Sequence, residues 1–233
     1  MLRPDFYSAI GLGGQYIAVS PAHDLVVVAL TSGRAGDNPF GYVPTLLNVD
    51  VAQAITSDQP LPDNPEAVAA LDAHLAAIAN PAPQAIEPAP EGMLALSGVP
   101  YALTEPLQLW SEPAYMAEER FGAPMDFDHF TLTFDTADTA LLDLVFSDGY
   151  TAHLTVGMDG VARVNDTRFG PLAVDGSWLP GNQVGLNVDL DFVGQGDDQT
   201  LTFRMRDDGL RVMWADPAFG GIAAARAQPA PAS

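Results

Sequence analysis

Apolar and polar residues alternate in short runs through residues 128 to 214, and each run ends at a turn sequence. The clearest run is 184–192, where every second residue is apolar and the residues between are Gly, Asn and Asp. Dipeptides that favour tight turns, such as Asp148-Gly149 and Asp208-Gly209, separate the runs. A period of two predicts strands with one buried face and one solvated face. We therefore expect a mainly antiparallel β domain of about eight strands.

This meander is expected to close into an up-and-down barrel. Closure would remove the exposed edges that so many strands otherwise present to other chains. An open, strongly curved sheet is the structural alternative. Three tryptophans of the β region, Trp110, Trp178 and Trp214, could line an interior cavity. Aromatic side chains in small barrels more often fill the core, so core positions are the expectation.

The first 58 residues follow a different pattern. The apolar runs 15–19 and 25–30 flank Pro21-Ala22-His23 and predict a β-hairpin. Residues 44–55 carry apolar side chains four apart and predict a helix that packs beside it. With the helix described next, this part is expected to be an α+β remnant, a hairpin plus two helices.

A second helix and a stiff linker are predicted between residues 59 and 92. Asp63 or Asn64 can cap the helix, and Pro65 suits its first turn. Its apolar stripe is Val68, Leu71, Leu75 and Ile78. The Pro-rich segment 81–90 then predicts an extended linker and a domain boundary. The barrel would occupy residues 93–216, and residues 217–233, which lack periodicity, would form a flexible tail.

The charge and the absence of cysteine exclude several classes of partner and site. A net charge of −21 argues against nucleic acid or an anionic membrane as partner, because phosphate contacts require Lys and Arg. The chain has no Cys, so disulfides and thiolate metal sites are excluded. No apolar run approaches the length of a membrane span. The first six residues lack the apolar stretch of a signal peptide, but the location of the protein stays open.

No metal or cofactor is expected. The four histidines, His23, His74, His129 and His153, do not have the spacing of metal ligands. His129 and His153 fall on the predicted wet face of two strands. Asp197-Asp198 lacks the alternating oxygen ligands of a calcium loop and predicts a hairpin loop instead.

Three segments carry a resemblance to known proteins. Residues 7–32 contain Gly11-Leu12-Gly13-Gly14-Gln15, then Pro21 and Asp24-Leu25-Val26-Val27-Val28. This run resembles the last sheet hairpin of serine hydrolases related to class C β-lactamases and penicillin-binding proteins. Residues 61–67, Leu-Pro-Asp-Asn-Pro-Glu-Ala, resemble a segment that follows the last catalytic helix of that family. Residues 97–101 resemble the opening of the lipocalin-like domains attached to such hydrolases.

The resemblance implies the C-terminal part of a bacterial hydrolase that transfers acyl groups from amides or esters. The family uses a Ser-x-x-Lys pair, but all nine basic residues here are Arg. No Tyr is followed two residues later by Asn or Ser, so the second family motif is absent too. The chain alone is therefore expected to be inactive, with no catalytic residue of its own.

The family's third motif corresponds to Ala9-Ile10-Gly11, which has no ionisable side chain. By resemblance, the backbone N–H of Leu12, next to Gly11, is the oxyanion-hole candidate. The alternative is that these glycines only form a tight entry to the strand.

Two kinds of partner and one alternative function follow. The resemblance implies a catalytic N-terminal portion as partner. Without it, the uncharged run Leu25 to Leu30 predicts self-association through the hairpin. The alternative is a free-standing β-barrel that binds a ligand or assists another protein and has no enzymatic activity.

Overall fold

A computed structural model describes residues 7–11, 15–30, 50–57, 59–109, 119, 121–194, 197–216 and 220–231. The chain forms two compact units, Met1–Ala82 and Pro83–Ser233. The boundary lies inside the predicted linker, but most of that linker belongs to the second unit. Each unit is described by itself.

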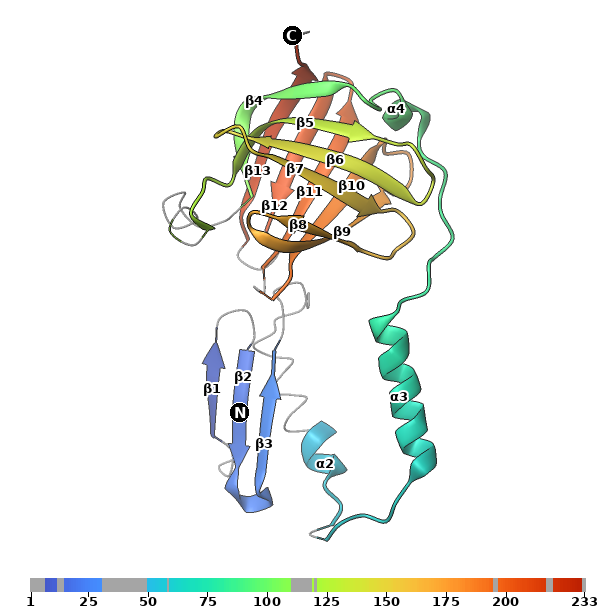
Figure 1. Cartoon of the computed structure of the whole chain (residues 1–233), viewed down its shortest axis with the longest axis vertical. Coiled ribbons are helices and arrows are strands. Elements are labelled where there is room, and N and C mark those ends of the chain that lie inside the picture. The colour runs from blue at the N-terminus through green and yellow to red at the C-terminus, as the bar shows by residue number, and fades with distance from the viewer. Residues whose placement is uncertain are drawn as a thin grey trace. The chain divides into compact units, whose positions relative to one another are not determined.

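The first unit contains a small antiparallel sheet, as the hairpin pattern predicted. Its strands are β1 (Tyr7–Gly11), β2 (Gln15–Ser20) and β3 (Leu25–Ala29), in the order β1-β2-β3 (Figure 1). The turn η1 (Pro21–His23) joins β2 to β3, and Asp24 follows it with φ of 48°. Tyr16 and Ala18 are buried on one face, whereas Ile17, Val26 and Val28 are exposed. Self-association through this hairpin stays a prediction.

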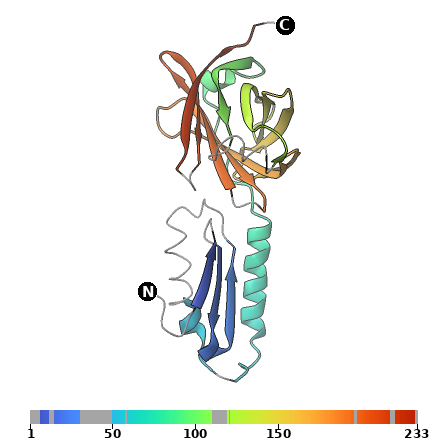
Figure 2. The ribbon, with the colours of Figure 1, turned by 90° about the vertical axis from the view of Figure 1, so that its left-hand side faces the viewer.

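Two helices complete the description of the first unit, α2 (Ala52–Ala54) and α3 (Pro65–Ala79) (Figure 2). Asn64 caps α3, because its Oδ1 accepts a hydrogen bond from the Ala67 N–H at 3.0 Å. The four stripe residues of α3 are more than half exposed. The first half of the helix predicted over 44–55, residues 44–49, lies outside the described residues. None of the described helices is long and apolar enough to cross a membrane.

The second unit is a closed β-barrel. The strands are β4 (Pro100–Gln108), β5 (Asp126–Thr133), β6 (Thr139–Phe146), β7 (Thr151–Gly157), β8 (Arg163–Thr167), β9 (Gly170–Trp178), β10 (Gly185–Phe192), β11 (Asp197–Arg206), β12 (Gly209–Ala215) and β13 (Ile222–Pro229). The sheet runs β10-β11-β12-β13-β4-β5-β6-β7-β9-β8, and pairing of β9 with β10 closes it (Figure 1). Nine described strands form the ring and β8 pairs with β9, which confirms the predicted barrel with more strands than expected.

The alternation that predicted the strands sorts their side chains between the two faces of the wall. On β10, Leu186, Val188 and Leu190 are fully buried. Asn187 and Asp189 accept hydrogen bonds from the hydroxyls of Thr202 and Thr200 on β11, at 2.8 and 2.7 Å. Polar cross-strand pairs thus cover the outer surface while apolar residues fill the interior.

The predicted flexible tail was wrong for residues 222–229, which form β13. This strand pairs with β12 on one side and with β4 on the other, so it completes the ring. Ala225 and Ala227 face inward and are buried. Ala223 lies opposite the buried Trp214, where a small side chain leaves room for the indole. An alanine-rich strand shows little hydrophobic alternation, which is why the sequence suggested a tail.

The barrel interior is filled by the protein's own side chains at its middle. Phe130 on β5 and Phe203 on β11, which are not neighbours in the sheet, meet with ring centroids 5.0 Å apart. Phe127 and Phe146 are buried too, and their ring centroids lie 6.4 Å apart. Trp214 is also a core residue, as predicted, whereas Trp110 lies outside the described residues. A ligand therefore cannot occupy this level of the lumen without displacing the core.

A side chain takes the place of a backbone ladder between β7 and β8. Asn165 on β8 accepts a hydrogen bond from the Thr155 N–H at 2.8 Å and donates to the Thr155 carbonyl at 3.1 Å. Its amide also donates to the Arg163 carbonyl at 2.9 Å. The described pairing of β7 with β9 consists of one residue pair, Gly157 with Asp175. Asn165 therefore adds hydrogen bonds at the place in the barrel wall, called the seam below, where the described backbone pairing of β7 with β9 is limited to one residue pair.

Candidate functional site

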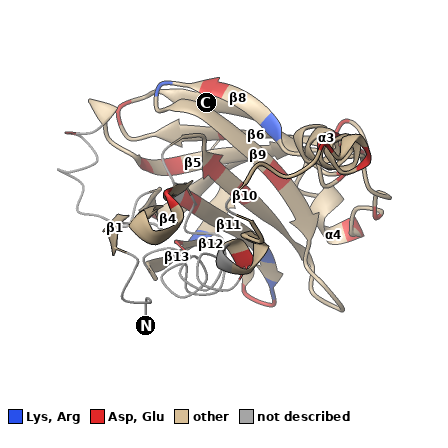
Figure 3. Cartoon of the chain, turned by 90° about the horizontal axis from the view of Figure 1, so that it is seen from below, with Lys and Arg blue, Asp and Glu red and all other residues tan. Residues whose placement is uncertain are grey.

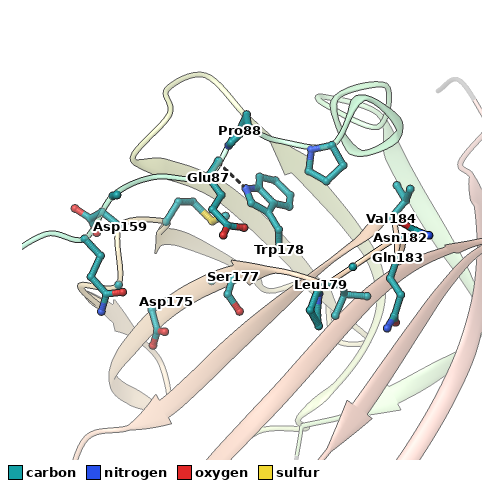
Figure 4. Close-up of a pocket in the computed structure, with 18 residues that line it drawn as sticks. Glu87, Pro88, Asp159, Asp175, Ser177, Trp178, Leu179, Asn182, Gln183 and Val184 are labelled. Atoms are coloured by element: carbon teal, nitrogen blue, oxygen red, sulfur yellow. Dashed lines mark hydrogen bonds between the residues drawn. The ribbon is translucent and has the colours of Figure 1, made fainter.

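Residues 83–90, called the strap below, follow the rim of the barrel without regular secondary structure. The Gln84 N–H donates a hydrogen bond to the Asp159 carbonyl at 2.7 Å. Trp178 Nε1 donates to the Glu87 carbonyl at 3.1 Å (Figure 4). The strap then enters the short helix α4 (Glu91–Leu94), whose Met93 is buried in the core. The predicted linker is thus fastened to the barrel for much of its length.

A groove opens between the strap and the barrel (Figure 4). It has a volume of about 1060 Å³ and is called the rim groove below. Its walls are the strap, the turn 158–160, the end of β9 at 175–178 and the loop 179–184. A smaller pocket of about 340 Å³, the side pocket, is also lined by Trp178, together with Ile86, Leu94 and Phe134 among others. Both cavities share Glu87, Pro88, Met158 and Trp178.

Trp178 is the central side chain of this region. It ends β9, is partly exposed, and contacts Phe134 with ring centroids 5.5 Å apart. Its hydrogen bond to Glu87 fixes the orientation of the indole. Gly176 lies two residues before it, where a Cβ would come within 2.9 Å of the Met158 sulfur. Glycine at this position therefore allows Met158 to form the floor shared by both cavities.

An ion pair holds the turn to which the strap is fastened. The Asp159 carboxylate, 7% exposed, accepts hydrogen bonds from Arg163 at 3.0 and 2.9 Å and from the Val161 N–H at 3.2 Å. The Arg163 hydrogen bonds hold the pKa of Asp159 below its usual value. A lowered pKa in the folded state stabilises the turn above about pH 4, and this stabilisation is lost as acid protonates the carboxylate. At neutral pH the anchor of Gln84 is therefore intact.

The rim groove is acidic. In the part of the chain that the structure describes, its lining includes Glu87, Asp159 and Asp175 and no Arg, Lys or His. Arg163 neutralises Asp159, whereas the Glu87 carboxylate lies beside Trp178 and places a negative charge next to the indole (Figure 4). Ser177, Gln84, Asn182 and Gln183 add neutral polar groups. Acidic residues also recur over the barrel strands, with few basic residues among them (Figure 3).

The oxyanion-hole candidates are only partly described. Gly11 ends β1 and pairs with Gln15 across the strand connection. A Cβ at Gly11 would come within 3.2 Å of the Gln15 Cβ, so close packing accounts for glycine here without any substrate. Leu12 lies outside the described residues. The oxyanion hole therefore stays a prediction.

The histidines of the barrel are paired with carboxylates on its outer face. His129 Nδ1 lies 2.6 Å from Asp128, and His153 Nδ1 lies 2.7 Å from Asp143 on the neighbouring strand. Both side chains are substantially exposed, as their strand positions predicted. Among the described residues, no three His, Asp or Glu side chains gather in a way that could hold a metal ion.

Sequence reasoning named Trp178 only with Trp110 and Trp214, as residues that could line a cavity but were expected in the core, and it missed the strap and the groove. Trp178 and Glu87 are 91 residues apart, and nothing in either local pattern joins them. The strap offers no sequence signal of its attachment, because Gln84 and Glu87 are fastened through their backbone groups.

Comparisons with known proteins give a weak structural likeness. No protein family model matches the chain, and no curated protein matches it. Among solved structures, it is similar to a fatty acid-binding protein from brain tissue of Drosophila melanogaster. The two chains are 17% identical, the match covers 58% of this chain and 99% of that one, and the TM-score is 0.38. The function is therefore argued from the rim groove.

Proposed function

We propose that the second unit is a binding module without catalytic activity and that its ligand site is the rim groove with the side pocket. The observation that carries this proposal is that Trp178, a partly exposed aromatic side chain, lines both cavities. Ligand sites are typically concave, with apolar walls and a few placed polar groups. The side pocket supplies apolar walls, the rim groove supplies polar groups, and together they have the volume to hold a small organic molecule.

The architecture supports a site at the rim of the barrel over one in its interior. Phe130 and Phe203 fill the middle of the lumen. The rim, in contrast, combines a rigid wall with a strap and loops, the arrangement by which scaffolds commonly present binding residues. The lining offers Ser177 as its hydroxyl but no His or Lys that could activate it, which favours binding over catalysis.

Binding of a neutral aromatic probe tests this proposal. We expect 2-phenylethanol to shift the amide signals of Ser177 and Gly160 and the indole N–H signal of Trp178 in NMR spectra of the full chain. Trp178→Ala should weaken binding at least about fivefold, because removal of a buried aromatic contact costs on the order of 1 kcal/mol or more. Leu141→Ala removes an exposed apolar side chain of β6 outside the groove and should leave the affinity unchanged.

Two outcomes would contradict the groove as the site. In one, Trp178→Ala binds the probe as tightly as the unchanged chain. In the other, shifts appear only at the exposed apolar residues of the first unit, such as Val26 and Val28.

A second candidate is that the chain is the C-terminal portion of a β-lactamase-related serine hydrolase. The sheet of the first unit favours it. Among the described residues β1 and β3 each pair only with β2, and the apolar residues Ile17, Val26 and Val28 are exposed. A sheet cut from a larger one would have these properties.

Covalent probes of serine chemistry test the second candidate. Because the chain has no Lys, incubation with a fluorophosphonate or penicillin probe should leave its mass unchanged. Stoichiometric labelling of a serine would contradict this expectation. A Ser-x-x-Lys motif encoded immediately upstream in the genome would support the candidate, and its absence there would count against it.

A further inference from the structure

We infer that the rim groove takes an organic ammonium ion, a primary or quaternary amine that carries an apolar group. The inference rests on the proposed binding function and adds the chemical class of the ligand. It follows from three features of the groove: its charge, the π-face of Trp178 and the adjoining apolar side pocket.

The charge of the lining selects for a cation. Glu87 contributes a carboxylate beside Trp178, and the lining residues that the structure describes include no Arg, Lys or His. Arg163 is engaged by Asp159, with two hydrogen bonds and the ion pair at 2.9 Å. A carboxylate or phosphate ligand would therefore meet like charge, in a chain whose net charge is already −21.

A ligand can contact the ring of Trp178 more readily than its N–H group. The indole N–H is already donated to the Glu87 carbonyl, so the polar edge of the ring is occupied. The Glu87 side chain lies beside Trp178 in the groove (Figure 4). A cation over an indole face is attracted by the ring quadrupole, and a nearby carboxylate adds to that attraction. Quaternary and primary amines are the ligands that such a pair of groups binds best.

The side pocket supplies the place for the apolar part of the ligand. It holds about 340 Å³ and is lined by Ile86, Leu94 and Phe134 next to Trp178. Because it shares Trp178, Met158 and Glu87 with the rim groove, one molecule can contact both cavities. An amine with an aromatic or short aliphatic tail matches this combination in size and polarity.

Three probes of nearly equal shape but different charge test the inference: 2-phenylethylammonium, 2-phenylethanol and phenylacetate. Each is titrated into the full chain at 10 mM salt, with the NMR signals of Trp178 and Ser177 as the readout. We expect the ammonium to bind about tenfold more tightly than the alcohol and phenylacetate to bind least. Salt at 0.5 M should reduce the preference for the ammonium, because screening weakens exposed charge interactions.

A matched pair of variants separates the local charge from the charge of the whole chain. Glu87→Gln keeps the size of the side chain and should reduce the tenfold preference to about threefold. Glu91→Gln removes the same charge from α4, outside the lining, and should leave the preference unchanged. Equal effects of the two variants would overturn the inference, because the preference would then come from the net charge.

The outcomes also distinguish this inference from the proposed function. If the alcohol binds as tightly as the ammonium, or phenylacetate binds most tightly, the ligand class is wrong and the binding site stands. If neither the ammonium nor the alcohol shifts Trp178, the proposed function fails as well.

Discussion

Removal of residues 220–233 should prevent the barrel from closing. The deletion takes away β13, which pairs with β12 over six residue pairs and with β4 over three. The strands β12 and β4 would become exposed edges, and the buried side chains of Trp214, Val212 and Tyr101 would meet water. We expect the truncated chain to aggregate or to unfold without a cooperative transition, as measured by circular dichroism on heating. Removal of residues 232–233 alone should leave the transition in place.

Two neighbouring alanines of β13 give a milder version of the same test. Ala225 faces the core and is buried, whereas Ala224 is exposed on the same strand. Ala225→Asp places an unpaired charge in the interior and should lower the free energy of unfolding by at least about 3 kcal/mol. Ala224→Asp should change it by less than about 0.5 kcal/mol. If residues 217–233 were a flexible tail, both variants and the truncated chain would melt like the unchanged protein.

The case of β13 shows where sequence patterning succeeds and where it fails. Along β10 neighbouring residues such as Leu186 and Asn187 differ strongly in hydrophobicity. A period of two is therefore visible in the sequence, and the strand was predicted. Along β13 the inward residues are alanines, and they lie opposite the larger residues Trp214, Val212 and Leu210 of β12. That information is held in another strand. The barrel as a class could therefore be predicted, but not the pairing of its first and last strands.

The candidate site was harder to predict for a related reason. Trp178 could be recognised as a residue able to line a cavity, but its role depends on Glu87 from a segment that resembles a linker. The strap is fastened by two hydrogen bonds that use a backbone N–H and two backbone carbonyls. Backbone groups are present in every sequence, so their pairing leaves no pattern to detect. Only the fold brings the strap and the end of β9 together.

Asn165 should prove to be one of the most sensitive polar positions of the barrel. Its amide hydrogen bonds to the N–H and carbonyl of Thr155, which backbone pairing would otherwise satisfy. Asn165→Leu keeps a similar size but leaves both backbone groups of Thr155 facing an apolar side chain. An unsatisfied buried backbone group costs about 1–3 kcal/mol. We therefore expect the free energy of unfolding, measured with urea, to fall by about 2–4 kcal/mol.

The neighbouring residue and a local probe make this prediction specific to the seam. Asp166 precedes the turn on the same strand but is exposed, so Asp166→Leu should change stability by less than about 0.5 kcal/mol. The Thr155 amide donates to Asn165 Oδ1 at 2.8 Å, and its hydrogen exchange should accelerate in Asn165→Leu more than that of Leu186 in the intact β10. Equal stability of the two leucine variants would contradict the prediction. The limited backbone pairing of β7 with β9 would then be enough to keep the barrel wall stable. The wall would not depend on the Asn165 side chain to complete its hydrogen bonding.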